Sequence, residues 1–313
     1  MVKAKRPSGD DKSGLKVWLD GKFIDYKDAK VPILTHSLQY GSGIFEGLRA
    51  YETGKGTAIF RLKDHVERFI RTAKIYQMDL GHTREEIENA IIECVKRNEL
   101  KSAYIRPFAF YNSDMIGLGT HGKGVSVFIA AVPFGAYFGK GVETGIRCKT
   151  SSWKRINSEI LPVEAKASGN YINSLIAHIE ATKSGFDEAI MLSGGGRIAE
   201  GTAENIFLYM DNMLLTPDYS ADILIGVTRN SIIDIARASG IEVVEAELHK
   251  EELYIADEVF FTGTAAEVTP IVNIDGVTVG GGKPGPITKM LAQKYSSITH
   301  GEDNVFGNWL TYI

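Results

Sequence analysis

A single lysine framed by small residues is the first candidate for chemistry. Lys166 lies in the segment PVEAKASGNYINSL, from Pro162 to Leu175, among alanine, serine and glycine. A lysine becomes a nucleophile when burial or a nearby cation lowers its pKa. Small neighbours leave room for a large planar group beside the ε-nitrogen, which favours covalent binding of such a group. The ordinary alternative is an exposed loop lysine.

Two turns of small residues are candidates for binding a phosphate. Gly226 stands two residues before Thr228, which we expect to cap a helix. The N-terminus of a helix attracts anions through its N–H groups and its dipole. The segment FTGTAAE forms a second turn, with hydroxyls at Thr262 and Thr264. These two turns predict a phosphate-bearing ligand.

An arginine and an acid complete the candidate set. Arg61 follows the apolar residues of TAIFRL, which we expect to form a strand, and there a guanidinium requires an anion. Glu204, in AEGTAENIFLY, lies among small residues at the start of an apolar strand, where a carboxylate requires a cation or an N–H donor. A lysine, two phosphate turns, an arginine and a buried acid together predict pyridoxal phosphate as the cofactor.

Other motifs carry less weight. Gly117, Gly119 and Gly122 match G-x-G-x-x-G, but a strand follows them where a dinucleotide site requires a helix. The sequence has no HExxH motif, paired histidines or acidic cluster, so we predict no metal site. It also lacks the GxSxG motif of a hydrolase nucleophile.

Composition indicates an ordinary globular protein. The 313 residues are 44% hydrophobic and 24% charged, which suits about two domains. A net charge of -4 gives no basic surface for nucleic acid. The two cysteines, Cys94 and Cys148, form no motif, which favours a reducing compartment. The N-terminus has no apolar signal region and no apolar stretch can span a bilayer, so we expect a cytoplasmic protein that does not bind membranes.

The first half of the chain predicts a small α+β domain. After a disordered tail over 1–15, Asp20-Gly21 marks a hairpin between two apolar runs. Strands are expected at 57–62, 102–111 and 125–134. Two capping boxes, one at 64–67 and one at 83–86, should each begin a helix. The small domain is expected to cover 16–134.

The second half predicts a larger domain. A glycine-rich segment at 135–145 is expected to be the interdomain linker. Residues 146–313 then contain many short strands joined by glycine turns, with helices after Tyr171, Thr228 and Pro286. This pattern favours a β-barrel-like core. The expected fold is therefore a two-domain mixture of α+β and α/β.

Eight motifs, occurring in order from about Lys16 to the end, resemble the branched-chain amino acid aminotransferases. They are YGSGIFEGLRAY, FRLKDHVERF, SAYIRP, SSWKR, AKASGNY, EGTAENIF, GVTRNSI and FTGTAAEVTP. The resemblance implies the class IV fold (fold type IV) of enzymes that use pyridoxal 5'-phosphate. It also implies reversible transamination of L-leucine, L-isoleucine and L-valine with 2-oxoglutarate, in a homodimer or a higher homo-oligomer.

The resemblance assigns roles to matching residues. Lys166 corresponds to the catalytic Schiff-base lysine, Glu204 to the acid on the pyridine nitrogen, and Tyr171 to the hydroxyl on the ring oxygen. The positions of the phosphate site are Arg61, Gly226, Val227, Thr228 and Thr264. The substrate-binding positions are Tyr40, Phe45, Gly47, Tyr104, Arg106, Phe134, Tyr137, Thr264 and Ala265, with Arg106 and the Thr264-Ala265 turn recognising carboxylates. Phe134 stands where tryptophan is common, and Ile225 where proline is frequent.

Two alternatives stay open. One is another enzyme of the same fold: an R-amine or D-amino-acid transaminase, or an aminodeoxychorismate lyase. The Tyr104-x-Arg106 pair and YGSGIFEG match the branched-chain pattern instead. The other is a non-catalytic binding protein, which a yellow chromophore in the purified protein would exclude.

Overall fold

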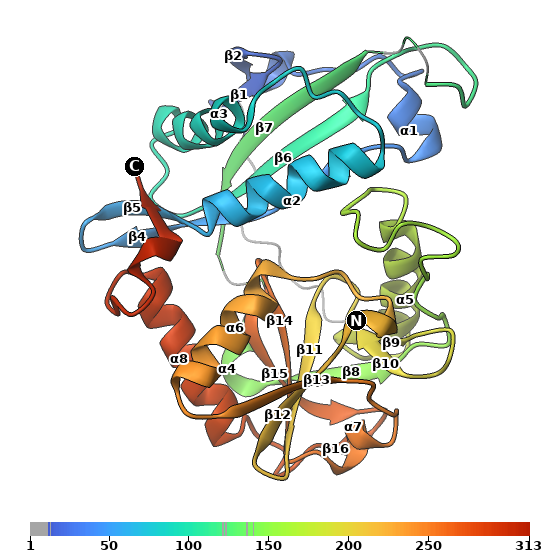
Figure 1. Ribbon diagram of the computed structural model, residues 1–313, viewed down its shortest axis with the longest axis vertical. Helices are drawn as coiled ribbons and strands as arrows, with labels where there is room; N and C mark the ends of the chain where they lie inside the picture. Colours follow the sequence, from blue (N-terminus) through green and yellow to red (C-terminus); the bar gives the residue numbers. More distant parts are fainter. Residues whose placement is uncertain (1–11, 13, 121, 123, 136, 140) are drawn as a thin grey trace. The chain divides into compact units, whose positions relative to one another are not determined.

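The chain folds into two compact units (Figure 1). The computed structural model describes residues 12, 14–120, 122, 124–135, 137–139 and 141–313. Unit 1 runs to Gly135 and also contains Trp309–Ile313, whereas unit 2 is the chain between them. Most of the expected tail, residues 1–11 and 13, lies outside the described residues.

Unit 1 is built on one antiparallel sheet in the order β17-β5-β4-β6-β7-β1-β2, with β3 also paired to β6. The Asp20-Gly21 hairpin prediction is confirmed, because Leu19 pairs with Lys22 and Gly21 has a φ of +88°. The elements of unit 1 are β1 (Lys16–Leu19), β2 (Lys22–Asp25), α1 (His36–Tyr40), β3 (Ile44–Phe45), β4 (Leu48–Thr53), β5 (Gly56–Phe60), α2 (Leu62–Ile75), α3 (Arg84–Arg97), β6 (Ala103–Tyr111), β7 (Val125–Pro133) and β17 (Leu310–Tyr312).

Helix α3 covers one face of this sheet (Figure 1). Alternate residues of β7, among them Val127 and Ile129, are fully buried, as are Ile87 and Ile91 of α3. Burying one such aliphatic side chain stabilises the fold by about 1.5–3 kcal/mol. The helix begins at the predicted capping box, since Thr83 accepts a bond from the Glu86 amide and the Glu86 side chain accepts one from the Thr83 amide. The sheet therefore has one helix-covered face, on which its core forms.

The chain end departs from the expected 146–313 domain. Strand β17 pairs with β5, joining Leu310 to Phe60, so the last residues belong to unit 1. This pairing satisfies backbone N–H and C=O groups of β5 that would otherwise be unpaired at the edge of the sheet. We did not predict this pairing from the sequence. The expected linker at 135–145 likewise contains a short helix, α4 (Gly141–Thr144), which packs on β15 of unit 2.

Unit 2 is a mixed sheet with three long helices around it. Its strands are β8 (Ile146–Thr150), β9 (Glu188–Leu192), β10 (Ile198–Glu200), β11 (Asn205–Met210), β12 (Met213–Pro217), β13 (Glu242–Ala246), β14 (Glu258–Gly263), β15 (Glu267–Ile274) and β16 (Val277–Thr278). Its other helices are α5 (Tyr171–Lys183), α6 (Val227–Ala238), α7 (Glu252–Ile255) and α8 (Pro286–Thr299). Helices follow Tyr171 and Pro286 as predicted.

Six strands of unit 2 close into a barrel in the order β8-β9-β10-β11-β14-β15. The closing contact pairs Glu200 of β10 with Asn205 of β11. Buried residues such as Ile190, Ile206 and Phe261 form its core. The predicted β-barrel-like core is thus confirmed, and α6 and α8 pack together on β14 and β15.

Within the part of the chain that the structure describes, we find no helix with the length and apolarity needed to cross a membrane.

Candidate active site

The Lys166 loop leads directly into α5. Asn170 Nδ2 donates hydrogen bonds to the carbonyl oxygens of Pro162 and Ala165, each at 3.0 Å, which folds the loop over the start of the helix. Lys166 Nζ donates to Tyr171 Oη at 2.6 Å. Lys166 is half-buried between two buried alanines. The structure therefore brings Lys166 and Tyr171 together at one end of α5.

Glu204 ends a tight turn between β10 and β11. The Gly201 amide donates to the Glu204 carbonyl at 2.7 Å, and the Ala203 amide donates to Glu204 Oε2 at 3.0 Å. A Cβ on Gly201 would lie 2.8 Å from Glu204 Oε2, so a larger residue here would displace the Glu204 carboxyl. Burial, followed by the negative charge of Glu188, raises the pKa of Glu204 to about 8, while the charge of nearby Lys166 opposes this rise.

The N-terminus of α6 is open to an anion. The prediction that Thr228 caps this helix is wrong: Gly226 is the N-cap residue, with extended dihedrals and no side-chain cap, and Val227 is the first helical residue. Thr228 therefore lies in the first turn, where backbone N–H groups have no intrahelical acceptor. A Cβ on Gly226 would lie 2.1 Å from Asn205 Oδ1, so glycine lets Asn205 reach this turn.

The turn between β14 and β15 carries Thr264 and Ala265, both half-buried. A Cβ on Gly263 would lie 3.6 Å from Glu204 Cγ, which puts this turn beside Glu204. Thr262 Oγ1 is buried and has no hydrogen-bond partner among the described residues. Thr262 pairs with Asn205 across the sheet, so the two side chains share a face.

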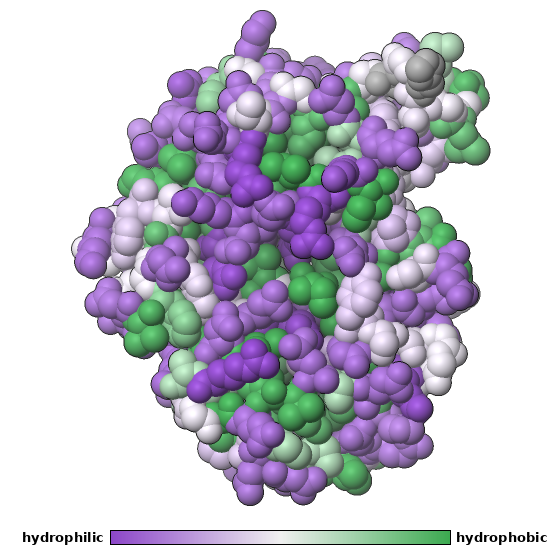
Figure 2. Space-filling view, in the orientation of Figure 1, coloured by the Kyte–Doolittle hydropathy of each residue, from purple (hydrophilic) through white to green (hydrophobic). Residues whose placement is uncertain are grey.

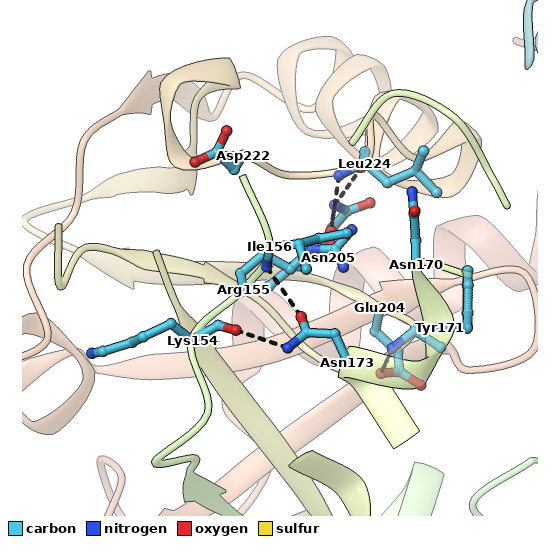
Figure 3. Close-up of polar contacts among 12 residues, drawn as sticks. Lys154, Arg155, Ile156, Asn170, Tyr171, Asn173, Glu204, Asn205, Asp222 and Leu224 are labelled. Atoms are coloured by element: carbon cyan, nitrogen blue, oxygen red, sulfur yellow. Dashed lines mark hydrogen bonds and ion pairs between the residues drawn. The ribbon is translucent and has the colours of Figure 1, made fainter. Parts of the chain in front are cut away.

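A buried network that sequence reasoning missed supports the α6 turn, and Figure 3 labels Arg155, Asn205 and Leu224 of this network. Arg155 Nε lies 2.7 Å from Glu200 Oε1. Glu200 Oε2 accepts bonds from the Leu224 amide at 3.1 Å and from Asn205 Nδ2 at 3.2 Å. Asn205 Nδ2 also donates to the Leu224 carbonyl at 2.8 Å. The SSWKR and EGTAENIF motifs contain Arg155 and Asn205, but these contacts form only through the tertiary fold.

Arg61 lies at a junction of unit 1. It follows β5 and is the N-cap residue of α2 in the left-handed conformation, with a φ of 51°, so its predicted position within a strand is wrong. Its Nε lies 2.6 Å from Asp64 Oδ2, and its guanidinium stacks 4.6 Å from the Trp309 ring centroid. The predicted capping box at 64–67 is also wrong, because α2 begins at Leu62 and Asp64 lies in its first turn.

Five of the predicted substrate residues form one cluster in unit 1. Arg106 Nη2 donates to Tyr104 Oη at 3.0 Å, and its guanidinium stacks 4.6 Å from the Phe45 ring centroid. The rings of Tyr104 and Phe134 are 5.1 Å apart. A Cβ on Gly47 would lie 2.1 Å from Tyr104 Oη, so glycine at this position leaves room for the Tyr104 hydroxyl. Arg106 Nε is buried without a hydrogen-bond partner in the described chain.

Tyr40 and Tyr137 are two further residues that we predicted to bind substrate. Tyr40, at the end of α1, accepts a hydrogen bond from the Gly117 amide at 3.0 Å and packs on His36. Tyr137 is exposed and belongs to unit 2, where its ring contacts Phe138.

Comparison with known proteins identifies the family. Residues 43–274 match the family model described as Amino-transferase class IV. The branched-chain-amino-acid aminotransferase of Pseudomonas aeruginosa is 45% identical over 304 residues, which are 97% of this chain and 98% of that protein. The chain therefore belongs to the class IV aminotransferase family.

Solved structures give the same result at a finer level. The crystal structure of the branched-chain aminotransferase from Thermoproteus uzoniensis with norvaline has a TM-score of 0.91 at 46% identity, covering 95% of this chain and 98% of that one. A branched-chain amino acid aminotransferase from T.th., complexed with N-(5'-phosphopyridoxyl)-L-glutamate, has a TM-score of 0.91 at 41% identity, covering 96% and 98%. Within its family, the chain belongs with the branched-chain-amino-acid aminotransferases.

Proposed function

We propose that this chain binds pyridoxal 5'-phosphate and reversibly transfers amino groups between L-leucine, L-isoleucine or L-valine and 2-oxoglutarate. The observation that carries the proposal is the pairing of Lys166 Nζ with Tyr171 Oη next to Glu204, in a member of the branched-chain family. The phosphopyridoxyl-glutamate compound bound by the T.th. relative supports 2-oxoglutarate as the acceptor.

The polar groups of unit 2 fit this cofactor. Lys166 has an amine within a half-buried loop, and the uncapped first turn of α6 offers N–H groups to a phosphate. The unsatisfied hydroxyl of buried Thr262 shares the face of Asn205, which touches that turn. Glu204 is a buried carboxyl that a cationic ring N–H would satisfy. The observed polar groups therefore correspond to the amine, phosphate and ring-nitrogen contacts that the cofactor requires.

Each residue then has a distinct task. The bound cofactor supplies an electron sink for negative charge at the substrate Cα. Lys166 would hold the cofactor through Nζ, and its free amine would act as the general base that takes the proton from the substrate Cα. Tyr171 orients Nζ, and Glu204 keeps a proton on the ring nitrogen by electrostatic stabilisation in a site with little water. Val227, Thr228 and Thr264, with Arg61 of unit 1, are the proposed phosphate ligands.

The unit 1 cluster suits both kinds of substrate. Phe45 and Phe134 offer apolar surface to a branched side chain, whose burial is worth about 1.5–3 kcal/mol. Arg106, with an unsatisfied Nε, offers a charge-assisted bond to the second carboxylate of glutamate. Tyr40, Gly47, Tyr104, Tyr137 and Ala265 are the other residues that we propose for substrate binding.

The test is made on the purified full chain. We expect a yellow chromophore, a borohydride-stable label on Lys166 after peptide mapping, and turnover of L-leucine that requires 2-oxoglutarate. Lys154, in the same unit, should stay unlabelled. A label on another lysine contradicts the site. Turnover without an acceptor indicates a lyase, and a preference for an R-amine or D-alanine contradicts the substrate class.

We also propose a homodimer formed around an exposed apolar patch of unit 1. The patch combines α1 and the residues just before it with the loop that follows β6. The His36 amide of α1 donates a hydrogen bond to the Ser113 carbonyl of that loop at 2.8 Å. Figure 2 shows hydrophobic residues at this loop, at the upper right. The exposed members of the patch are Ile33, Leu34, Leu38, Tyr40, Met115, Ile116 and Leu118. Apolar patches of this kind mark association surfaces.

A further inference from the structure

Glu188 is a buried carboxylate to which the proposed reaction gives no role. It begins β9 and has an exposed fraction of 0%. Its Oε1 accepts hydrogen bonds from the Ala189 amide at 2.7 Å and from Thr202 Oγ1 at 2.9 Å. His178 Nδ1 of α5 lies 3.0 Å from both carboxylate oxygens. A buried charge is costly unless it is paired and hydrogen-bonded, and this charge has three partners.

The Thr202 contact ties Glu188 to the turn that carries Glu204. The turn runs from Gly201 to Glu204 and is closed by the hydrogen bond between the amide of Gly201 and the carbonyl of Glu204, at 2.7 Å. Thr202 and Ala203 are the two central residues, and the Ala203 amide fixes the Glu204 carboxylate. A fixed Thr202 side chain therefore limits how the Glu204 carboxylate can move.

We propose that Glu188 and Thr202 are positioning residues for Glu204: the buried carboxylate holds the threonine hydroxyl and thereby fixes the turn that orients the Glu204 carboxyl. This inference rests on the proposed function, because it assumes that Glu204 meets the cofactor ring. The hydrogen bond to Glu188 raises the pKa of His178, which favours the charged form of the imidazole beside this carboxylate. Glu200 and Lys166 are two further charged groups that act on Glu204.

The chain offers a matched control for Thr202. Thr216 of β12 is also a threonine of unit 2, is fully buried, and donates from Oγ1 to the Ile206 carbonyl at 2.9 Å. Thr202→Val and Thr216→Val therefore each remove one threonine hydroxyl and its hydrogen bond, but only the first releases the Glu204 turn. Thr202→Ser keeps the hydroxyl and serves as the conservative rescue.

The first readout does not need the cofactor. The infrared carbonyl band of the protonated Glu204 carboxyl, identified by its loss in Glu204→Gln, is followed against pH in the cofactor-free full chain. In Thr202→Val we expect the midpoint to fall by about one unit, because water reaches a loosened turn. Thr202→Ser and Thr216→Val should keep the wild-type midpoint. Glu188→Gln, which removes a like charge, should also lower it.

The second readout is cofactor release from the holoenzyme on dilution. Thr202→Val should release pyridoxal 5'-phosphate about tenfold faster than wild type, and Thr216→Val at the wild-type rate. If both valine variants behave alike in both readouts, the inference is wrong. If the wild type binds no pyridoxal 5'-phosphate, the proposed function is wrong, and the carboxyl titration still decides whether Thr202 and Glu188 act on Glu204.

Discussion

At the scale of single residues, Glu204 should make the stability of the cofactor-free chain depend on pH. Its pKa rises from 4.5 to about 8 on folding, so the native state holds one extra proton between these values. The free energy of unfolding therefore falls as pH rises from about 4.5 to about 8. Urea unfolding at several pH values should show this fall in the wild type and a weaker one in Glu204→Gln. Parallel curves for the two proteins would count against the raised pKa.

Arg106 gives a second prediction at this scale. Its buried Nε has no hydrogen-bond partner in the described chain, so the guanidinium keeps one donor for a substrate carboxylate. We expect Arg106→Leu to reduce kcat/KM for glutamate by about tenfold or more, because a charge-assisted hydrogen bond is worth roughly 1.5–3 kcal/mol. Leucine turnover should change far less. Arg97→Leu, at an exposed arginine of the same unit, is the control, and equal losses on both substrates would make Arg106 a scaffold residue.

At the scale of elements, a capping box in the sequence correctly predicted the start of a helix only where no contact with a distant part of the chain intervened. The Thr83–Glu86 capping box begins α3 as predicted, since both of its hydrogen bonds lie within one turn. The equally good pattern at 64–67 does not begin α2. The Arg61 amide instead donates to the Trp309 carbonyl at 2.7 Å, and the left-handed residue at Arg61 starts the helix at Leu62. The start of α2 therefore depends on a contact with residues near the C-terminus and not on the local capping pattern.

At the scale of the whole molecule, the exposed apolar patch of unit 1 predicts self-association. Light scattering at assay concentration should report a dimer or a multiple of it. Ile116→Glu should shift the population toward monomer, because a charge in an apolar contact loses its hydration. Ile255→Glu, at another exposed isoleucine on α7, is the control and should leave the mass unchanged. An active monomeric wild type would contradict the proposed homodimer.

The sequence by itself determined the family, the barrel-centred second unit and most strands, because hydrophobic alternation, glycine turns and motif order are local properties of the chain. It also selected Lys166 and Glu204 as candidates from their neighbours, and Tyr171 through the family resemblance. Tertiary structure alone decided which groups meet. The Arg155–Glu200–Asn205 network, the Glu188–Thr202 contact and the return of β17 to unit 1 join residues from separate elements. Such pairings depend on how strands close a sheet, and local propensity does not encode them.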